Sequence, residues 1–462
     1  MDADELQRAA IDHLWLHFSR MGDYAAGKEL PVIVSGEGCT LTDSHGRTYL
    51  DALAGLFAVQ IGYSHGEEIG RAALEQMREL PFYTNWGYAH PRAIELASRL
   101  AELAPPGLER VFFTSSGSEA VESAWKLARQ YHTLRGERRW KAISRDVAYH
   151  GTSLGALSIT GVAALREPFE PLVPSVARVS HTGRLHRPAG ESEAEFTAWL
   201  LDELERTIVR EGPQTIAMVI MEPVQNAGGA FVPPAGYWAG VRELCDRFGI
   251  LLCADEVISG FGRMGAWFAC ERYGIRPDLI TCAKGLSSGY AAIGALVASE
   301  RVMEPFLGEG ASFSHGLTFG GHPVQAAIAL ANLRIMERLG LVERVAANQD
   351  AFERALGQLR ALPIVGDVRG TGYFWAIELV KDQDGRARFT RPESESLVRG
   401  ILSGRLLDAG LICRADDRGD PVIQLSPPLI AGQEEFDRVV AVLGEVLTEA
   451  HERVREPAFT GR

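Results

Sequence analysis

The stretch "DLITCAKGLSSGYAAIGALV", residues 278–297, places Lys284 among small and apolar residues, with no charged neighbour for several positions on either side. The apolar run before the lysine is typical of a buried strand. A buried lysine costs several kcal/mol unless it has a partner or loses its proton, and its neutral amine is a nucleophile that forms imines with aldehydes. We therefore expect a strand that ends next to a reactive lysine.

Apolar runs of similar character recur between residues 110 and 299, separated by longer helical or loop segments. This alternation is typical of βαβ units and predicts a mostly parallel, buried sheet flanked by helices. The runs are RVFFTSS (110–116), KAISR (141–145), TIAMVIMEPV (215–224), GILLCADEV (249–257), DLITCAKG (278–285) and IGALVAS (293–299).

Short strand candidates at both chain ends predict a second, smaller domain that is built from both ends. They lie within residues 39–53, 365–380, 411–415 and 422–428.

Helical periodicity predicts helices over residues 66–80 and 91–104 and a strongly helical region over 323–361. The stretch PLVPSVARVSHTGRLHRPAGESEAE, residues 171–195, shows no such periodicity and is expected to be an irregular excursion.

The chain has 462 residues and a formal net charge of −13, from 47 Lys and Arg against 60 Asp and Glu. This balance argues against a general nucleic-acid-binding protein. No run approaches the roughly 18 apolar residues of a membrane span, and the acidic N-terminus lacks the cationic region of a secretory signal. The six cysteines form no C-x-x-C pair, so neither a metal site nor a disulfide framework is indicated. We expect a cytoplasmic protein without nucleic-acid or membrane partners.

Polar residues follow several predicted strands, at the edge where ligands of open α/β sheets bind. Ser116, Gly117 and Ser118 precede a long helical pattern, and the free N–H groups of such a helix start bind anions such as phosphate. The same serines also serve as simple helix caps, and the residues alone leave both uses open.

Three further side chains follow strands of the same sheet. Tyr149, next to His150, either stacks on a flat ligand or packs in the core. Asp255 closes an apolar strand, where a carboxylate requires a cation such as a protonated pyridine nitrogen. Together with Lys284, these residues match what pyridoxal 5′-phosphate (PLP) needs, which is a phosphate cradle, a ring stack, an acid at the ring nitrogen and a lysine for the aldehyde.

With these motifs the chain resembles the class III, fold type I, PLP-dependent aminotransferases, and among them the ω-transaminases of the amine:pyruvate type. The resemblance implies a large PLP-binding domain (63–328) with a mostly parallel seven-stranded sheet between helices. A smaller α+β domain would combine an N-terminal segment (1–62) with a C-terminal one (329–462). The motifs are GLFAVQIGYSH (55–65), FTSSGSEAVESAWKLAR (113–129), YHGTSLGALS (149–158), MEPVQNAGG (221–229), ADEVISGFGRMG (254–265), AKGLSSG (283–289), GLTFGGHPV (316–324), VRGTGYFWAIEL (368–379) and LICRADDRGDPVIQLSPPLI (411–430).

The resemblance implies roles for the residues at the strand ends. Lys284 is expected to form the Schiff base with PLP and to move the proton between substrate and cofactor. Asp255, the other catalytic residue, is expected to bind the pyridine nitrogen. Val257 would pack on one face of the ring, and Tyr149 would stack on the other with His150 beside it.

The remaining cofactor contacts also follow from the resemblance. Gly117 and Ser118, with Ser116, are expected to hold the phosphate, and Glu222 to support the side of the ring that carries the hydroxyl. Thr318, in GLTFGGHP, resembles the residue that reaches the phosphate of the neighbouring subunit. This match implies a homodimer with shared active sites, and it leaves open whether dimers pair into tetramers.

Arg414, in GLICRADDRGD, is the most informative residue for the substrate. It either forms an ion pair with Asp416 or Asp417 or, as the resemblance implies, binds the carboxylate of a keto acid and swings out for an apolar amine. Ala227 stands in QNAGG, where the 4-aminobutyrate and ornithine branch usually has QGEGG. The glutamate that gates a second arginine in that branch is therefore absent.

An aromatic substrate pocket is expected from Phe57, Tyr83 and Trp86, with Trp15 and Phe18 added from the N-terminal helix. Such a lining suits an apolar or aryl-alkyl group.

The expected activity is transfer of an amino group from a primary amine or ω-amino acid to a keto acid, with pyruvate as the acceptor, by a ping-pong mechanism through pyridoxamine phosphate. The alternatives are a 4-aminobutyrate, β-alanine or taurine transaminase, an aminomutase or decarboxylase on the same scaffold, and a non-enzymatic protein with this fold.

Overall fold

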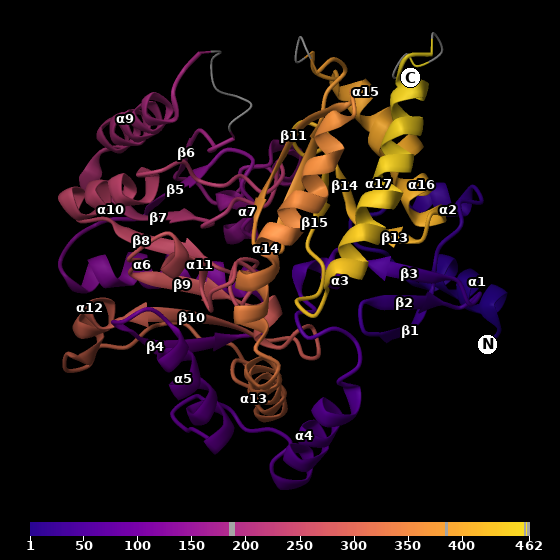
Figure 1. The fold of residues 1–462 in the computed structure, drawn as a ribbon. Coiled ribbons are helices and arrows are strands. Elements are labelled where there is room, and N and C mark those ends of the chain that lie inside the picture. The colour runs from indigo at the N-terminus through magenta and orange to yellow at the C-terminus, as the bar shows by residue number, and fades with distance from the viewer. Residues whose placement is uncertain (184–189, 384–386, 457–458, 460–462) are drawn as a thin grey trace.

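A seven-stranded sheet runs through the computed structural model, which describes residues 1–183, 190–383, 387–456 and 459 (Figure 1). The strand order is β4-β10-β9-β8-β7-β5-β6. β10 is antiparallel to both of its neighbours, and the pairs from β9 to β6 are parallel. The predicted α/β class with a mostly parallel seven-stranded sheet is therefore confirmed. The strands are β4 (Leu108–Thr114), β5 (Lys141–Arg145), β6 (Val176–Val179), β7 (Ile216–Met221), β8 (Leu251–Asp255), β9 (Leu279–Cys282) and β10 (Gly294–Ser299).

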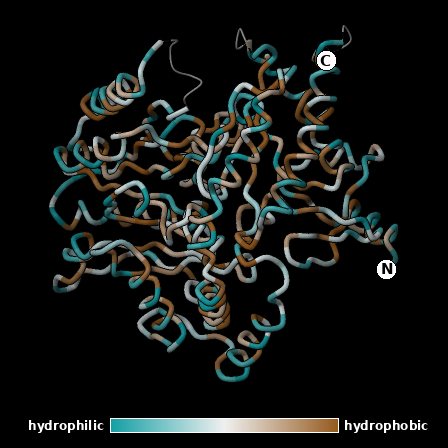
Figure 2. The backbone as a smooth tube through the Cα atoms, viewed as in Figure 1, coloured by the Kyte–Doolittle hydropathy of each residue, from teal (hydrophilic) through white to brown (hydrophobic). Residues whose placement is uncertain are grey.

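Alternate residues of β8 pack against two different helix layers. Leu252 and Ala254 belong to the hydrophobic cluster that includes α10 (Tyr237–Phe248), and Leu251 and Cys253 belong to the cluster around α6 (Gly117–Leu134). Successive side chains of a strand point to opposite faces, so helices cover both faces of the sheet. Strands buried on both faces are apolar throughout rather than alternating, and the hydrophobic segments of the interior can be followed in Figure 2.

Two four-stranded sheets form the smaller part of the molecule. In the first sheet, β3 pairs in parallel with β13, so that Leu50 lies opposite Leu411 and the two chain ends are joined. Figure 1 accordingly shows the indigo strands β1 to β3 beside the orange and yellow C-terminal elements. The strands are β1 (Ile33–Glu37), β2 (Thr40–Asp43), β3 (Thr48–Asp51) and β13 (Leu411–Ile412) in the first sheet, and β11 (Val365–Thr371), β12 (Phe374–Leu379), β15 (Val422–Leu425) and β14 (Arg414–Asp416) in the second.

The helices predicted over 66–80 and 91–104 are confirmed as α4 (Gly66–Glu79) and α5 (Pro91–Leu103). The helical region over 323–361 divides into α13 (Pro323–Arg338) and α14 (Leu341–Gly357), which are separated at Gly340. Residue 328 therefore lies inside α13. The domain boundaries at 62/63 and 328/329 stay predictions.

The remaining helices connect the strands or cover the small sheets, and the described chain contains no helix that is both long and apolar enough to cross a membrane. They are α1 (Ala3–His13), α2 (Met21–Ala25), α3 (Ala54–Phe57), α7 (Leu154–Ile159), α8 (Ala163–Arg166), α9 (Glu193–Glu211), α11 (Ala269–Arg272), α12 (Glu300–Met303), α15 (Arg391–Glu395), α16 (Ser403–Asp408) and α17 (Gln433–Val454).

The irregular excursion predicted for residues 171–195 is wrong in two places. Val176–Val179 forms β6, which pairs in parallel with β5 at the edge of the large sheet, and α9 begins at Glu193. An edge strand of four residues is too short for its pattern to be recognised. The start of α9 did carry a signal, because Ser192 and Glu195 form a capping box. Residues 184–189 of this stretch lie outside the described chain.

Asn332 of α13 supports the segment that follows Lys284. Its Nδ2 donates to the carbonyl oxygens of Gly285 at 2.9 Å and Leu286 at 3.0 Å, and the side chain is fully buried. Buried carbonyls without a donor are costly, so this asparagine stabilises the turn at the carboxyl end of β9.

We expect Asn332→Ala to lower the free energy of unfolding by about 2 kcal/mol, because two buried carbonyl oxygens lose their donor. The shift in the urea midpoint measures the effect. Asn348→Ala is the matched control, since Asn348 is a half-buried helical asparagine that donates to the Arg344 carbonyl at 2.9 Å. Its expected cost is about 0.5 kcal/mol or less. Equal shifts in the two variants would contradict the supporting role of Asn332.

Candidate active site

Two adjoining cavities lie where several strands of the large sheet end. The inner one has a volume of about 290 Å³ and the outer one about 1180 Å³, and both are lined by Tyr149, Ile258 and Lys284. The inner cavity is otherwise formed by segments that follow the strands, as expected for an open α/β sheet. These segments are residues 115–118, 150–152, 222, 224, 255, 257, 259, 283 and 291–293.

Lys284 begins a short 3-10 turn, Lys284–Leu286, directly after β9 and Ala283. Its φ of 42° is in the left-handed region, where a non-glycine residue is strained. Burial lowers the pKa of Lys284 to about 8, although the carboxylates of Asp255 and Glu222 raise it. A useful fraction of the amine is therefore neutral near physiological pH, as a nucleophile or general base requires.

Asp255, the last residue of β8, is held by three donors. Its Oδ2 accepts from His150 Nδ1 at 2.6 Å, and its Oδ1 accepts from Thr281 Oγ1 at 3.1 Å and from the Val257 N–H at 3.2 Å. Because a carboxylate oxygen accepts, His150 Nδ1 carries the proton. Asp255 and His150 are thus a buried pair of fixed orientation in the wall of the inner cavity.

Two buried atoms of the inner cavity's side chains, His150 Nε2 and Glu222 Oε2, have no hydrogen-bond partner among the described residues. The other oxygen of Glu222 accepts from the Asn226 N–H at 3.0 Å, and burial raises the pKa of Glu222. Unpartnered buried polar atoms are costly, so a cavity walled by such residues is suited to a polar ligand.

The N-terminus of α6 borders the same cavity. Ser116 is the helix cap and accepts from the Glu119 N–H at 3.2 Å, so the capping alternative is observed for this serine. Gly117 and Ser118 lie in the first turn, where the N–H groups carry partial positive charge. A Cβ atom on Gly117 would lie 2.9 Å from Val257 Cγ1, so glycine is required for the close approach of these two residues.

Tyr149 and Val257, the two predicted ring-packing residues, both line the inner cavity. The guanidinium of Arg418 lies 5.6 Å from the centre of the Tyr149 ring. Val147, two residues earlier, has a φ of 63°, which is rare for a β-branched residue and marks a strained connection from β5 to the cavity.

Arg414 lines the outer cavity together with Lys284 and Phe57. Its Nε lies 3.4 Å from Asp416 Oδ2, so the ion pair considered as one alternative is present. Burial lowers the pKa of Arg414 to about 10, which leaves it charged at neutral pH. The side chain is 27% exposed, and its terminal nitrogens make no hydrogen bond to any described residue.

Tyr83, Trp86 and Thr318, three predicted residues with exposed side chains, line neither cavity of their own chain. Tyr83 and Trp86 are 46% and 61% exposed, and Trp86 Nε1 approaches the carbonyl of Leu317, next to the exposed Thr318, at 3.5 Å. The structure therefore brings Tyr83, Trp86 and Thr318 to one exposed surface region and does not place them in the pocket of the same subunit.

Of the two aromatic residues considered from the N-terminal helix, Phe18 lines the outer cavity and Trp15 does not. Both lie beyond the end of α1 at His13.

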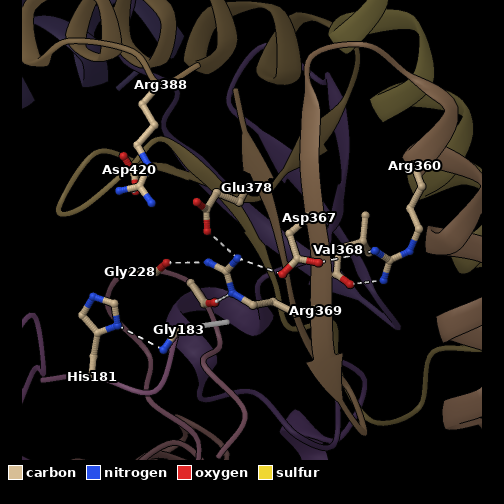
Figure 3. A network of polar contacts seen from close by, with 11 residues as sticks. His181, Gly183, Gly228, Arg360, Asp367, Val368, Arg369, Glu378, Arg388 and Asp420 are labelled. Carbon is tan, nitrogen blue, oxygen red and sulfur yellow. Dashed lines mark hydrogen bonds and ion pairs between the residues drawn. The ribbon is translucent and has the colours of Figure 1, made fainter. Parts of the chain in front are cut away.

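The loop that contains Ala227 is held by the smaller domain. Ala227 is fully buried, and its neighbour Asn226 lines the outer cavity. Arg369 Nε donates to the Gly229 carbonyl at 2.6 Å, and its Nη2 donates to the Gly228 carbonyl at 2.8 Å (Figure 3). A strand of the smaller domain thereby positions one wall of the outer cavity.

Neither Arg369 nor Arg418 is among the residues predicted from the sequence. Arg369 carries no local signal for this contact, because the Gly228 and Gly229 carbonyl groups that it binds precede it by 141 and 140 residues. Arg418 does carry a local sequence signal, since it lies four positions after Arg414 in the same charged loop, RADDRGD.

Comparisons with known proteins agree with this geometry. A family model described as Aminotransferase class-III matches residues 24–447. A probable aminotransferase of Mycobacterium tuberculosis is 54% identical over 445 residues, which cover 96% of this chain and 94% of that protein. The putrescine–pyruvate aminotransferase of Pseudomonas aeruginosa is 38% identical over 450 residues and 96% of both chains. The thermostable (S)-enantioselective ω-transaminase of Thermomicrobium roseum superposes with a TM-score of 0.93 at 39% identity, covering 97% of this chain and 99% of that one.

The inner cavity fits PLP, the cofactor of this family. PLP needs an anion site, a carboxylate for its ring nitrogen and a lysine for its aldehyde. The cavity provides the start of α6, Asp255 and Lys284, and the unpartnered atoms of His150 and Glu222 belong to side chains of its wall. From its sequence, its fold and this cavity, the chain belongs to the class III aminotransferases and is a PLP-dependent transaminase.

Proposed function

We propose that this transaminase moves the amino group of a primary amine or ω-amino acid to pyruvate by a ping-pong mechanism. The observation that carries the proposal is Arg414, whose terminal guanidinium nitrogens make no hydrogen bond to a described residue and which shares the outer cavity with Lys284 and the apolar side chain of Phe57. Such a cavity accepts both a carboxylate and an apolar group. The putrescine–pyruvate aminotransferase among the relatives, with its amine donor and pyruvate acceptor, supports the proposal.

We further propose how the inner cavity holds the cofactor. The first turn of α6, with Gly117 and Ser118, binds the phosphate, since its N–H groups attract anions. Asp255, oriented by His150, binds the protonated ring nitrogen. Three more residues complete the cofactor site, namely Tyr149 and Val257 on the two ring faces and Glu222 near the ring hydroxyl.

Lys284 carries the proton in this proposal. PLP supplies an electron sink for the carbanion formed when the substrate loses a proton. The Lys284 amine would accept that proton at Nζ and release it again, and its pKa of about 8 keeps both protonation states accessible near neutral pH.

We also propose a homodimer with shared active sites. The exposed surface region formed by Tyr83, Trp86 and Thr318 would complete the cavity of the second subunit, which explains why these residues lie outside the cavity of their own chain. The three-segment domain division and the cytoplasmic location rest on the sequence and remain proposals.

The purified protein with PLP is expected to form alanine from pyruvate with amine donors, and to prefer pyruvate to 2-oxoglutarate. Arg414→Gln should raise the KM for pyruvate about tenfold or more, since one charge-assisted carboxylate contact is lost. The KM for an uncharged aryl-alkyl amine should stay within about twofold. Arg405→Gln, which removes an arginine of α16 that pairs with Glu449 at 2.8 Å, is the control. Absence of pyruvate-dependent turnover, or a preference for 2-oxoglutarate, would contradict the proposal.

In protein freed of cofactor, the rate of reductive methylation of Lys284 should rise through a midpoint near pH 8, because only the neutral amine reacts. Asp255→Asn should move this midpoint to lower pH, since the Asp255 charge raises the pKa of Lys284. Mass spectrometry of the Lys284 peptide gives the rates. Asp246→Asn, which removes an exposed carboxylate of α10, should leave the midpoint in place. A midpoint that is unchanged in Asp255→Asn would refute the electrostatic coupling.

Shared active sites predict complementation between inactive subunits. Lys284→Ala and the double variant Trp86→Ala/Thr318→Ala should recover activity when they are co-expressed, because one site of the mixed dimer is then intact. Lys284→Ala with Asp255→Asn should recover none, since both residues line the same cavity of one chain. The dimer itself should elute at twice the chain mass of 50.3 kDa. Failure of the first pair to recover activity rules out shared sites.

A further inference from the structure

Arg414 shares its counter-ion with a second arginine. The side chain of Asp416 is 4% exposed. Both of its carboxylate oxygens accept from Arg418 Nε at 2.9 Å. Its Oδ2 also accepts from Arg418 Nη2 at 2.5 Å, and its Oδ1 accepts from the Arg418 backbone N–H at 3.1 Å. The contact from Asp416 to Arg414 Nε is longer, at 3.4 Å, which is beyond ordinary hydrogen-bond length. Asp416 is therefore bound firmly to Arg418 and loosely to Arg414.

Arg418 is in turn fixed over a residue of the inner cavity. Its guanidinium lies 5.6 Å from the centre of the Tyr149 ring, a cation–π distance, and its side chain is mostly buried. The carboxylate of Asp416 is thus anchored, through Arg418, next to a residue of the cofactor cavity.

Among the residues that the structure describes, Arg414 has a polar contact to its guanidinium only at Nε. Its terminal nitrogens have no hydrogen bond among the described residues and share a cavity with Lys284. The charge of Arg418 repels Arg414, and Asp416 opposes this repulsion. Asp416 is accordingly the group that keeps a second cation close to Arg418.

We propose that Asp416 is a positioning residue for the acceptor: it holds Arg414 at Nε and leaves the terminal nitrogens available to the substrate carboxylate. Arg418 takes up most of the hydrogen-bonding capacity of Asp416 and so keeps it from closing on Arg414. The inference deepens the proposed function and rests on it in one respect, namely that the ligand of Arg414 is a carboxylate.

If Asp416 acted on anion binding only through its charge, Asp416→Asn would change propionate affinity in the opposite direction. Removing a negative charge beside the cavity makes it more positive and strengthens anion binding. Removing a group that positions Arg414 weakens anion binding instead. The sign of the change in Asp416→Asn therefore separates positioning from bulk electrostatics.

The experiment is a calorimetric titration of the PLP-loaded enzyme with propionate, a carboxylate that has no amino or keto group to react. Asp416→Asn should weaken propionate binding about tenfold, equivalent to one charge-assisted contact. Asp417→Asn is the matched control, because it removes the same charge one residue later in the same cavity, where Asp417 pairs with Arg399 at 3.7 Å. Its propionate affinity should be unchanged or higher.

Two further variants exclude a merely structural effect. In an Arg414→Gln background, Asp416→Asn should change propionate affinity by less than about twofold, since the residue acts through Arg414. Asp416→Glu keeps the charge and the fold but moves the carboxylate, so it should also weaken propionate binding, and it serves if Asp416→Asn does not fold. In turnover, the KM for pyruvate should rise while the KM for an uncharged amine stays constant.

Unchanged or tighter propionate binding in Asp416→Asn and Asp416→Glu would overturn the proposal. So would an equal loss in Asp417→Asn, an additive effect in the Arg414→Gln background, or a wild-type enzyme that binds no propionate. If propionate binding follows the predicted pattern but the enzyme does not use pyruvate, the proposed function fails and the role of Asp416 stands.

Discussion

The desolvation of a single amine, that of Lys284, is the constraint on which the rest of the site depends. The amine needs apolar walls to lower its pKa and nearby carboxylates to limit that lowering. Parallel strands supply both, because their apolar runs end at one edge where Asp255 and Glu222 also lie. The strained turn at Lys284 is tolerated because Asn332 bonds the two carbonyl groups that follow it.

The two cavities divide the chemistry between the two parts of the molecule. The inner cavity is built from the large domain alone, whereas the outer one takes Arg414 and its neighbours from the C-terminal strands. Figure 3 shows how the parts are joined, with Arg369 between the buried Glu378 at 2.5 Å and the carbonyl groups of the Ala227 loop. The guanidinium of Arg369 also lies over the ring of Phe231, and the ring of His181 stacks on that of Phe231. Substitutions in the wall of the outer cavity can therefore change the substrate preference while the residues of the inner cavity stay the same.

The sequence identifies best those features that local physics dictates. Lys284 and Asp255 stand out because a charged residue at the end of an apolar strand needs an explanation, whereas Glu222 is implied by the family resemblance; all three line the inner cavity. The four-residue edge strand β6 cannot be predicted from the sequence, because so short a segment has no distinct pattern. Tyr83 and Trp86, expected in the pocket, lie outside both cavities of their own chain, because a local pattern of aromatic residues does not determine where the fold places them. The contact of Arg369 with the Ala227 loop has no local signal, because the carbonyl groups that it binds are distant in sequence.

The parallel pairing of β3 with β13 also determines when the substrate cavity comes into existence during synthesis. All residues of the inner cavity lie between positions 115 and 293, so the ribosome has made every one of them well before the chain is finished. Arg414 and Asp416 come some 120 residues later, and their strand is set in place by Leu411 and Ile412 pairing with Leu50 and Asp51 near the other end. A nascent chain thus holds the residues of the inner cavity at a time when Arg414 and Asp416 of the outer cavity have not yet been made.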